Sequence, residues 1–179
     1  MIPVFLDPAQ TKIALVGRGP LLARRLQWLR QAGAEPEVWS DEPLDEGAAL
    51  TPRLPPSDEI VAYHAIWIAG LSEAEAAPLA QAARDAGRLV NVEDVVALCD
   101  FHTPAVVRRG RLTLAVGTGG ASPAVARAAR ERLEAAFPEI WAGALDEIAV
   151  SRAALRAGKA DFDTLVADAR ARLAQHGLI

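Results

Sequence analysis

Two patterns of hydrophobic and polar positions take turns along the first half of the chain. Short apolar runs indicate buried strands, and apolar residues at helical spacing lie between them. The strands are predicted at 11–16, 37–39, 50–54, 65–69 and 89–92, and the helices at 21–32, 57–62 and 72–87. Strand and helix therefore take turns, which predicts an α/β fold: a Rossmann-like, mostly parallel sheet with helices on both faces. A short apolar run at 3–6 is expected to add an edge strand, and a polar, proline-rich stretch occupies 41–56.

The pattern changes after Val92. Two strands at 104–108 and 111–116 are joined by Arg109-Gly110, which indicates a hairpin. Ser122 and Pro123 then occupy the N-cap and first positions of a helix that ends at Phe137. Two further helices, at 139–158 and 161–177, carry no chemical motif and are best explained by packing and oligomerisation.

Three regions follow from this pattern. Residues 1–111 are expected to form a Rossmann-like NAD-binding domain, 112–137 a dimerisation segment, and 138–179 a short helical tail. The dimerisation segment combines an apolar strand with an alanine-rich helix, and too little sheet remains to cover both.

Composition excludes several classes of protein. The net charge of −4, with acids and bases mixed along the chain, does not fit a nucleic-acid binder. No apolar segment approaches the roughly 20 residues that span a bilayer, and no signal peptide is visible. Cys99 is the single cysteine, so no intrachain disulfide can form. We therefore expect a cytoplasmic protein that contacts neither membrane nor nucleic acid.

The first glycine turn carries a dinucleotide-binding pattern. It follows a buried strand and opens a helix, and Asp41 lies just past the end of the next strand, 22 residues beyond Gly19. Such an acid binds a ribose diol and repels a 2′-phosphate, which favours NAD over NADP; alternatively, Asp41 is a turn residue beside Pro43. Leu22 stands where glycine or alanine is usual, which weakens the pattern. The predicted cofactor-binding residues are Gly17, Arg18, Gly19, Pro20, Leu21 and Asp41.

A second glycine turn, from Gly117 to Gly120, precedes the helix capped by Ser122. Backbone N–H groups and the positive end of a helix dipole make such a turn a receptor for an anion, although an ordinary capped helix explains it equally well. Arginines flank the turn and can bind carboxylates in a bidentate manner. The predicted substrate-binding residues are Arg109, Gly119, Gly120, Ser122 and Arg127.

Asp94 is the strongest candidate for proton chemistry. It follows the strand at 89–92, at the carboxyl edge where open α/β sheets bind ligands, and a partly desolvated carboxylate there can act as a general base. A cap is its alternative role, and Glu93 is an adjacent substitute. His102 is either a structural residue or a proton carrier, and no motif indicates a stable metal site.

Three segments together resemble the siroheme synthase family. They are VGRG at 16–19, VNVEDV in the middle, and PAVVRRGRLTLAVGTGGASPAVARAARERLE from Pro104. More narrowly, the chain is similar to the precorrin-2 dehydrogenase and sirohydrochlorin ferrochelatase module, with the similarity extending from Ile2 to about Phe137. Arg18 departs from the family because it replaces the middle glycine of a G-G-G turn.

The resemblance implies NAD-dependent oxidation of precorrin-2, a tetrapyrrole with eight carboxylate side chains, to sirohydrochlorin. It implies a homodimer, places the family's catalytic aspartate at Asp94, and suggests that ferrous iron is then inserted transiently in the same pocket. Two other functions stay open: a non-catalytic nucleotide-sensing or tetrapyrrole-binding module on this scaffold, and an NAD oxidoreductase that acts on small substrates.

Overall fold

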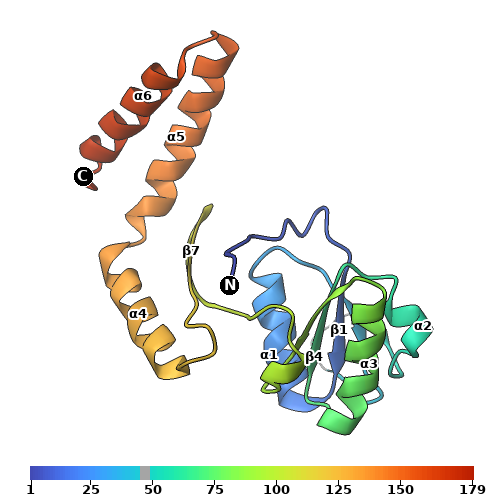
Figure 1. Cartoon of the computed structure of the whole chain (residues 1–179). Coiled ribbons are helices and arrows are strands. Elements are labelled where there is room, and N and C mark those ends of the chain that lie inside the picture. The colour runs from blue at the N-terminus through green and yellow to red at the C-terminus, as the bar shows by residue number, and fades with distance from the viewer. Residues whose placement is uncertain (45–48) are drawn as a thin grey trace. The chain divides into compact units, whose positions relative to one another are not determined.

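The computed structural model describes residues 1–44 and 49–179, which form two compact units, 1–103 and 104–179 (Figure 1). Residues 45–48, within the polar stretch predicted at 41–56, lie outside the described part. The first unit contains β1 (Ile13–Gly17), α1 (Gly19–Arg30), β2 (Glu37–Trp39), β3 (Leu50–Thr51), α2 (Ser57–Ile60), β4 (Ala65–Ala69), α3 (Glu73–Asp85), β5 (Leu89–Val92) and the 3₁₀ turn η1 (Val96–Leu98).

The five strands of the first unit form one parallel sheet in the order β3-β2-β1-β4-β5. Val16 lies opposite Trp39 on one side and Ile68 on the other, and Ile68 lies opposite Val92. The predicted Rossmann-like sheet is therefore confirmed. Because the chain reverses its direction of strand addition next to β1, the carboxyl ends of β1 and β4 flank the crevice where this fold binds ligands.

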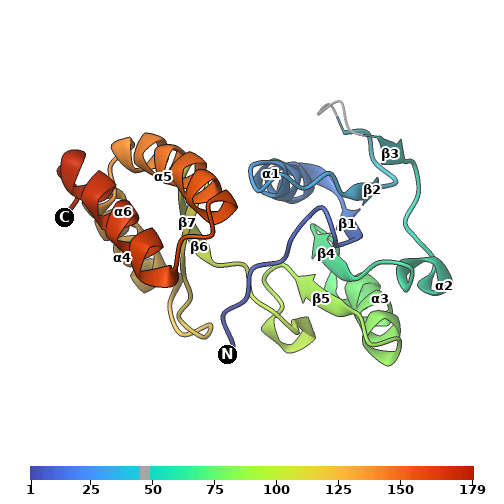
Figure 2. The ribbon, with the colours of Figure 1, turned by 90° about the horizontal axis from the view of Figure 1, so that it is seen from above.

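Successive residues of the strands bury their side chains on opposite faces, as the two-residue period of a strand requires. Ala14 and Val16 pack in a core formed with α2 and α3, and Ile13 and Leu15 pack in a core formed with α1. Figure 2 shows α1 on one face of the sheet and α3 on the other. Both helix starts agree with the sequence: Pro20 lies in the first turn of α1, and Ser72 caps α3 in a capping box with Glu75.

The strand predicted at 3–6 is wrong. Val4 and Phe5 are exposed, and residues 3–6 take no part in either sheet among the described residues. An apolar run becomes a strand only where a neighbouring strand supplies ladder hydrogen bonds, and the edge strands β3 and β5 gain no further partner here.

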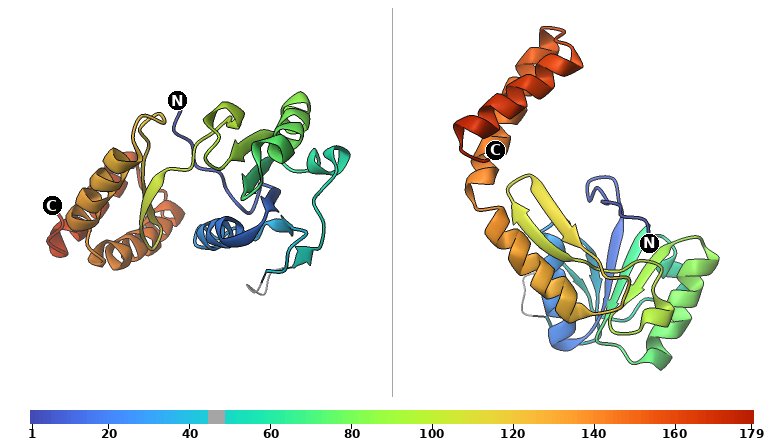
Figure 3. Two further views of the ribbon diagram at one scale, coloured as in Figure 1. Left: turned by 90° about the horizontal axis from the view of Figure 1, so that it is seen from below. Right: turned by 60° about the vertical axis from the view of Figure 1, so that its left-hand side comes forward.

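The second unit contains β6 (Ala105–Arg109), β7 (Leu112–Val116), α4 (Pro123–Ala136), α5 (Ile140–Ala157) and α6 (Phe162–Gln175). The predicted hairpin is confirmed, with Arg109 opposite Leu112 and the turn at Gly110 and Arg111. The helix α4 packs against this hairpin, and α5 runs beside α6, as Figure 3 shows. The domain boundary expected at residue 111 would separate β6 from β7, which pair with each other. The two compact units of the structure instead divide after Thr103.

Within residues 1–44 and 49–179, no helix combines the length and the apolar content needed to cross a bilayer.

Candidate functional site

The carboxyl edge of the parallel sheet gathers most of the residues predicted to do chemistry in the first unit. The turn after β1 begins at Arg18, Asp41 lies two residues beyond β2, and Asp94 lies two residues beyond β5. Two backbone hydrogen bonds extend the ladder at this edge, from Arg18 N to Ala69 O (3.1 Å) and from Glu93 N to Ile68 O (2.9 Å). The turns that follow β1 and β5 are therefore both fixed to the end of β4.

The first glycine turn depends on a close approach of two backbones. A Cβ atom added at Gly17 would lie 1.7 Å from Ala69 O, and one added at Gly70 would lie 2.3 Å from Arg18 O. Both residues also have positive φ angles, which a side chain disfavours. Gly17 and Gly70 thus lock the turn after β1 against the end of β4.

Gly19 differs from Gly17 because it faces open space. Its φ is 60°, and an added Cβ would meet no atom within 4 Å. Backbone N–H groups at a helix start with such clearance fit the close approach of a pyrophosphate. Pro20 contributes no N–H group, and Leu21 follows it in the first turn of α1. The turn therefore fits the phosphate part of a dinucleotide.

Leu22 packs in the core beneath α1. It is fully buried, in the same core as Leu15, Leu26 and Trp67. The third position of the glycine pattern is therefore a packing residue in this chain.

The side chain of Arg18 connects the end of β2 to the first turn of α3. Its Nε and Nη2 atoms donate to the two carboxylate oxygens of Asp41 at 2.5 and 2.8 Å, and Nη1 donates to Glu75 Oε1 at 2.7 Å. The bidentate geometry is the strong form of this interaction. The acid predicted to bind a ribose is thus paired with the arginine of the glycine turn.

The three charges shift one another's pKa. The hydrogen bond from Arg18 lowers the pKa of Asp41. Hydrogen bonds from Ser72 and then from Arg18 lower the pKa of Glu75 to about 2, and the two carboxylates raise that of Arg18. Two carboxylates against one guanidinium leave this cluster with one net negative charge at neutral pH.

The residues after β5 differ sharply in exposure. Asp94 is exposed, which corrects the expected partial desolvation within this chain, and it adopts a left-handed conformation with φ 65°. The side chain of Glu93 is only 8% exposed and forms ion pairs with Arg24 and Arg25 of α1. The carboxylate of Glu93 thus has a structural role in ion pairs, whereas solvent or a ligand can reach the carboxylate of Asp94.

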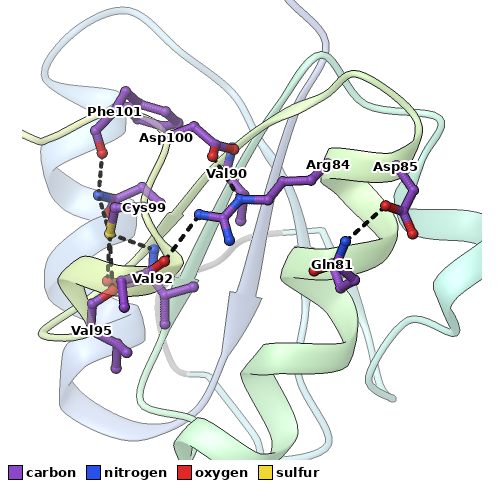
Figure 4. Close-up of polar contacts among 11 residues, drawn as sticks. Gln81, Arg84, Asp85, Val90, Val92, Val95, Cys99, Asp100 and Phe101 are labelled. Carbon is purple, nitrogen blue, oxygen red and sulfur yellow. Dashed lines mark hydrogen bonds and ion pairs between the residues drawn. The ribbon is translucent and has the colours of Figure 1, made fainter. Parts of the chain in front are cut away.

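The thiol of Cys99 contacts the backbone at the end of β5, as Figure 4 shows. Val92 N donates to Cys99 Sγ (3.3 Å), and the thiol donates to Val92 O (3.1 Å). Asn91 Nδ2 donates to Phe101 O (2.8 Å), which closes the loop beyond η1. Burial raises the pKa of Cys99, so the thiol keeps the proton that it donates.

In the second unit, the second glycine turn forms as predicted. Gly119 and Gly120 both have positive φ angles, and Ser122 caps α4 by accepting from Val125 N at 3.3 Å. Thr118 Oγ1 donates to Ser122 O (3.2 Å) and accepts from Ser122 N (3.3 Å). The turn is therefore braced from inside by Thr118, a residue that the sequence did not single out.

The arginines near this turn have different surroundings. Arg109 donates from Nε to Phe137 O (2.6 Å) and from Nη2 to Glu134 O (3.3 Å), so it binds the carbonyls at the end of α4. Arg127 is exposed and pairs with Glu131 one helical turn away at 3.0 Å. Of these two predicted carboxylate ligands, Arg109 thus has a structural function, and Arg127 is the more accessible.

His102 is half-buried in the segment that follows the β5 loop. Its neighbours anchor that segment: Phe101 packs edge-on against Trp67, and Thr103 Oγ1 accepts from Trp67 Nε1 at 3.4 Å. In the described ranges, no three His, Cys, Asp or Glu side chains gather where a metal would bind.

Comparison with known proteins agrees with this geometry. Residues 4–105 match the model of the family described as "Putative NAD(P)-binding". The chain belongs to this family. The match covers the glycine turn, Asp41 and Asp94, and its description leaves NAD and NADP unresolved.

Siroheme synthases are similar over most of the chain, which confirms the resemblance. Siroheme synthase of Nitrosococcus oceani is 33% identical over 148 residues, 78% of this chain and 32% of that protein. Siroheme synthase 1 of Pectobacterium atrosepticum is 34% identical over 158 residues, 84% of this chain and 33% of that protein. The chain thus spans about a third of the length of these relatives.

A solved structure has the same fold. It is "SirC, precorrin-2 dehydrogenase", with a TM-score of 0.73 and 20% identity, covering 95% of this chain and 88% of that one.

Two participants were missed from the sequence. The sequence pattern gives Glu75 no role and indicates Glu93 only as a substitute for Asp94. Their partners, Arg18 and Arg24, lie 57 and 69 residues away, so only the tertiary fold reveals these contacts.

Proposed function

We propose that this chain oxidises precorrin-2 to sirohydrochlorin with NAD as the acceptor. One observation carries the proposal: an exposed acid, Asp94, stands at the same sheet edge as a glycine turn with room for a pyrophosphate. The siroheme synthases among the relatives and the precorrin-2 dehydrogenase with this fold support the same chemistry.

Oxidation of precorrin-2 removes a hydride and a proton. When bound, the nicotinamide cofactor supplies the hydride acceptor. The role of this chain is to take the proton at a carboxylate oxygen of Asp94, while the N–H groups around Gly19 hold the cofactor's phosphates. Gly17, Arg18, Pro20 and Leu21 shape that turn.

The charge beside the turn supports NAD rather than NADP. Asp41 and Glu75 exceed Arg18 by one negative charge, and a 2′-phosphate at the end of β2 would be repelled by this excess. We expect NAD to bind at least roughly tenfold more tightly than NADP, or about 1.4 kcal/mol. Asp41→Asn removes the excess and should narrow that ratio, which calorimetric titration of both nucleotides measures.

For the substrate, the second unit offers a glycine turn at the start of a helix. We propose that Gly119 and Gly120 meet one carboxylate of the tetrapyrrole through backbone N–H groups and Ser122 meets it through its hydroxyl, and that Arg127 binds another. Arg109 would support this site by holding the end of α4 against the hairpin.

The deciding experiment supplies precorrin-2 and NAD to the purified chain without oxygen. We expect NADH and sirohydrochlorin to appear in equal amounts, at rates above a no-protein control. Binding of NAD or of the tetrapyrrole without turnover would instead support the non-catalytic module. Turnover of small hydroxy compounds without oxidation of precorrin-2 would indicate the other alternative, an NAD oxidoreductase that acts on small substrates.

Ferrochelatase activity is a second proposal, supported by the exposure of Asp94, which can accept the pyrrole protons released as ferrous iron enters. His102 is a candidate second carrier. Sirohydrochlorin with ferrous or cobaltous ion, followed by the spectrum of the metallated product, tests it. A rate that vanishes in Asp94→Ala and persists in His102→Ala would support chelation and remove His102 from it. A rate equal to the control would leave a dehydrogenase alone.

A further inference from the structure

Asp94 has an unusual backbone for a residue with a side chain. Its φ of 65° lies in the left-handed region, where Asp is tolerated but not favoured. A single residue keeps such a conformation when its surroundings fix it, and the neighbours of Asp94 do so on both sides.

On the preceding side, Glu93 is held through its backbone and its side chain. Its N–H group donates to Ile68 O of β4, and one carboxylate oxygen is hydrogen-bonded to Arg24. The other oxygen, Oε2, lies 3.2 Å from Arg25 Nη2, without a hydrogen-bond partner among the described residues. A carboxylate buried this deeply depends on its cationic neighbours.

On the following side, Val95 N donates to Val92 O at 3.2 Å and closes the turn around Asp94. The Cys99 thiol donates to the same carbonyl. The position of Asp94 is thus set by the end of β5, by η1 and, through Glu93, by α1.

We propose that Glu93 is the positioning residue for Asp94 and that it couples Asp94 to the cofactor helix. Arg24 and Arg25 lie in the second turn of α1, the helix that begins at Gly19 in the glycine turn. The ion pairs with Glu93 therefore set the distance between the group that takes the proton and the helix that faces the cofactor's phosphates. This inference rests on the proposed dehydrogenase function.

Glu93→Gln tests the inference because it keeps the size of the side chain and removes its charge. We expect kcat for precorrin-2 oxidation to fall about 10- to 100-fold, with the Kd for NAD within about twofold. Arg24→Gln, at an exposed position on the far side of the ion pair, should fold readily and lower kcat about threefold.

A double-mutant cycle separates positioning from a loss of stability. If Glu93 acts through Asp94, Glu93→Gln should change kcat less than about threefold in an Asp94→Asn background. An equal loss of kcat in both backgrounds, or no loss in the parent background, would overturn the proposal.

The matched control is Asp100→Asn. It breaks the ion pair with Arg84 (2.7 Å) and the hydrogen bond to Val90 N (3.0 Å), at the opposite end of β5 from Asp94. This variant should lower stability while leaving kcat within about twofold. A loss of kcat equal to that of Glu93→Gln would mean that any loosening of the loop suffices.

Amide hydrogen exchange provides a readout that needs no activity. The Val95 amide should exchange about tenfold faster in Glu93→Gln than in the parent, and at the parent rate in Asp100→Asn. An inactive parent whose Val95 amide responds in this way would disprove the dehydrogenase function and retain the coupling through Glu93. An active parent with an unresponsive amide would contradict the coupling alone.

Discussion

The two units differ in how completely they bury their own apolar side chains. In the first, both faces of the sheet are covered, and two clusters of buried residues fill the space beneath α1 and α3. In the second, the buried hydrophobic residues among those described are Val107, Ala144 and Leu165, and α4 contributes none of them.

This difference in burial indicates which unit has a core large enough to hold its own backbone conformation. The first unit has enough core to hold strained features, such as the left-handed Asp94 and the contact of Gly17 with β4. The second unit leaves Val125 of α4, Val150 of α5 and Phe162 of α6 largely exposed. We propose that a second copy of the chain covers part of this exposed surface, at the segment 112–137.

Alanine substitutions at two glycines, one in each unit, should show the largest difference in unfolding free energy. Gly17→Ala places a Cβ 1.7 Å from Ala69 O and should cost about 3 kcal/mol of unfolding free energy or more, with loss of NAD binding. Gly117→Ala meets open space and should cost less than about 0.5 kcal/mol. Denaturant unfolding of both variants measures the contrast, and equal losses would contradict the close approach.

Truncations of apolar side chains should follow the same division. Leu26→Ala removes a fully buried side chain beneath α1 and should cost about 3 kcal/mol. Val150 is 74% exposed, so Val150→Ala should cost less than about 0.5 kcal/mol. If Val150→Ala instead costs more than Leu26→Ala at every protein concentration, the second unit has a core that the chain alone does not reveal.

The oligomeric state tests the proposed covering of the second unit. Light scattering at micromolar concentration should give about twice the chain mass of 19.0 kDa. Val125→Asp, on α4, should shift the protein to a monomer, because a charge would be buried in the interface. Val4→Asp is the matched control at a similarly exposed valine of the first unit and should leave the dimer intact. A monomeric parent would refute the dimer.

Acid pH should have the smallest effect on stability. In the first unit this effect involves the carboxylate of Glu75. Hydrogen bonds from Ser72 and Arg18 lower the pKa of folded Glu75 to about 2, below its ordinary value near 4.5, so these contacts stabilise the fold above pH 4.5. That contribution is lost as the pH falls from 4.5 towards 2. Thermal unfolding across this range should show a smaller acid loss in Glu75→Gln than in the parent, and identical pH profiles would contradict the assignment.

Much of the first unit follows from local sequence. The strand, the glycine turn, the capped helices and the acids at strand ends each have signals within a few residues, such as Pro20 at a helix start. The wrong strand at 3–6 has the same local signal as a real one, because pairing is decided by neighbours far along the chain.

The missed contacts have the same physical origin. Arg18 in the glycine turn meets Glu75, and Glu93 meets Arg24, only once β4 has paired with β1 and β5 has paired with β4. Leu22 packs with Leu15 and Leu26 in the core beneath α1, a contact that the glycine pattern does not reveal.

The most direct test of the account is the rate of precorrin-2 oxidation in Asp94→Asn. The variant keeps the size of the side chain and loses its basicity, so kcat should fall about 10²–10⁴-fold while the Kd for NAD stays nearly unchanged. Turnover of precorrin-2 by Asp94→Asn at the parent rate would contradict the account, because Asp94 would then be a structural residue only.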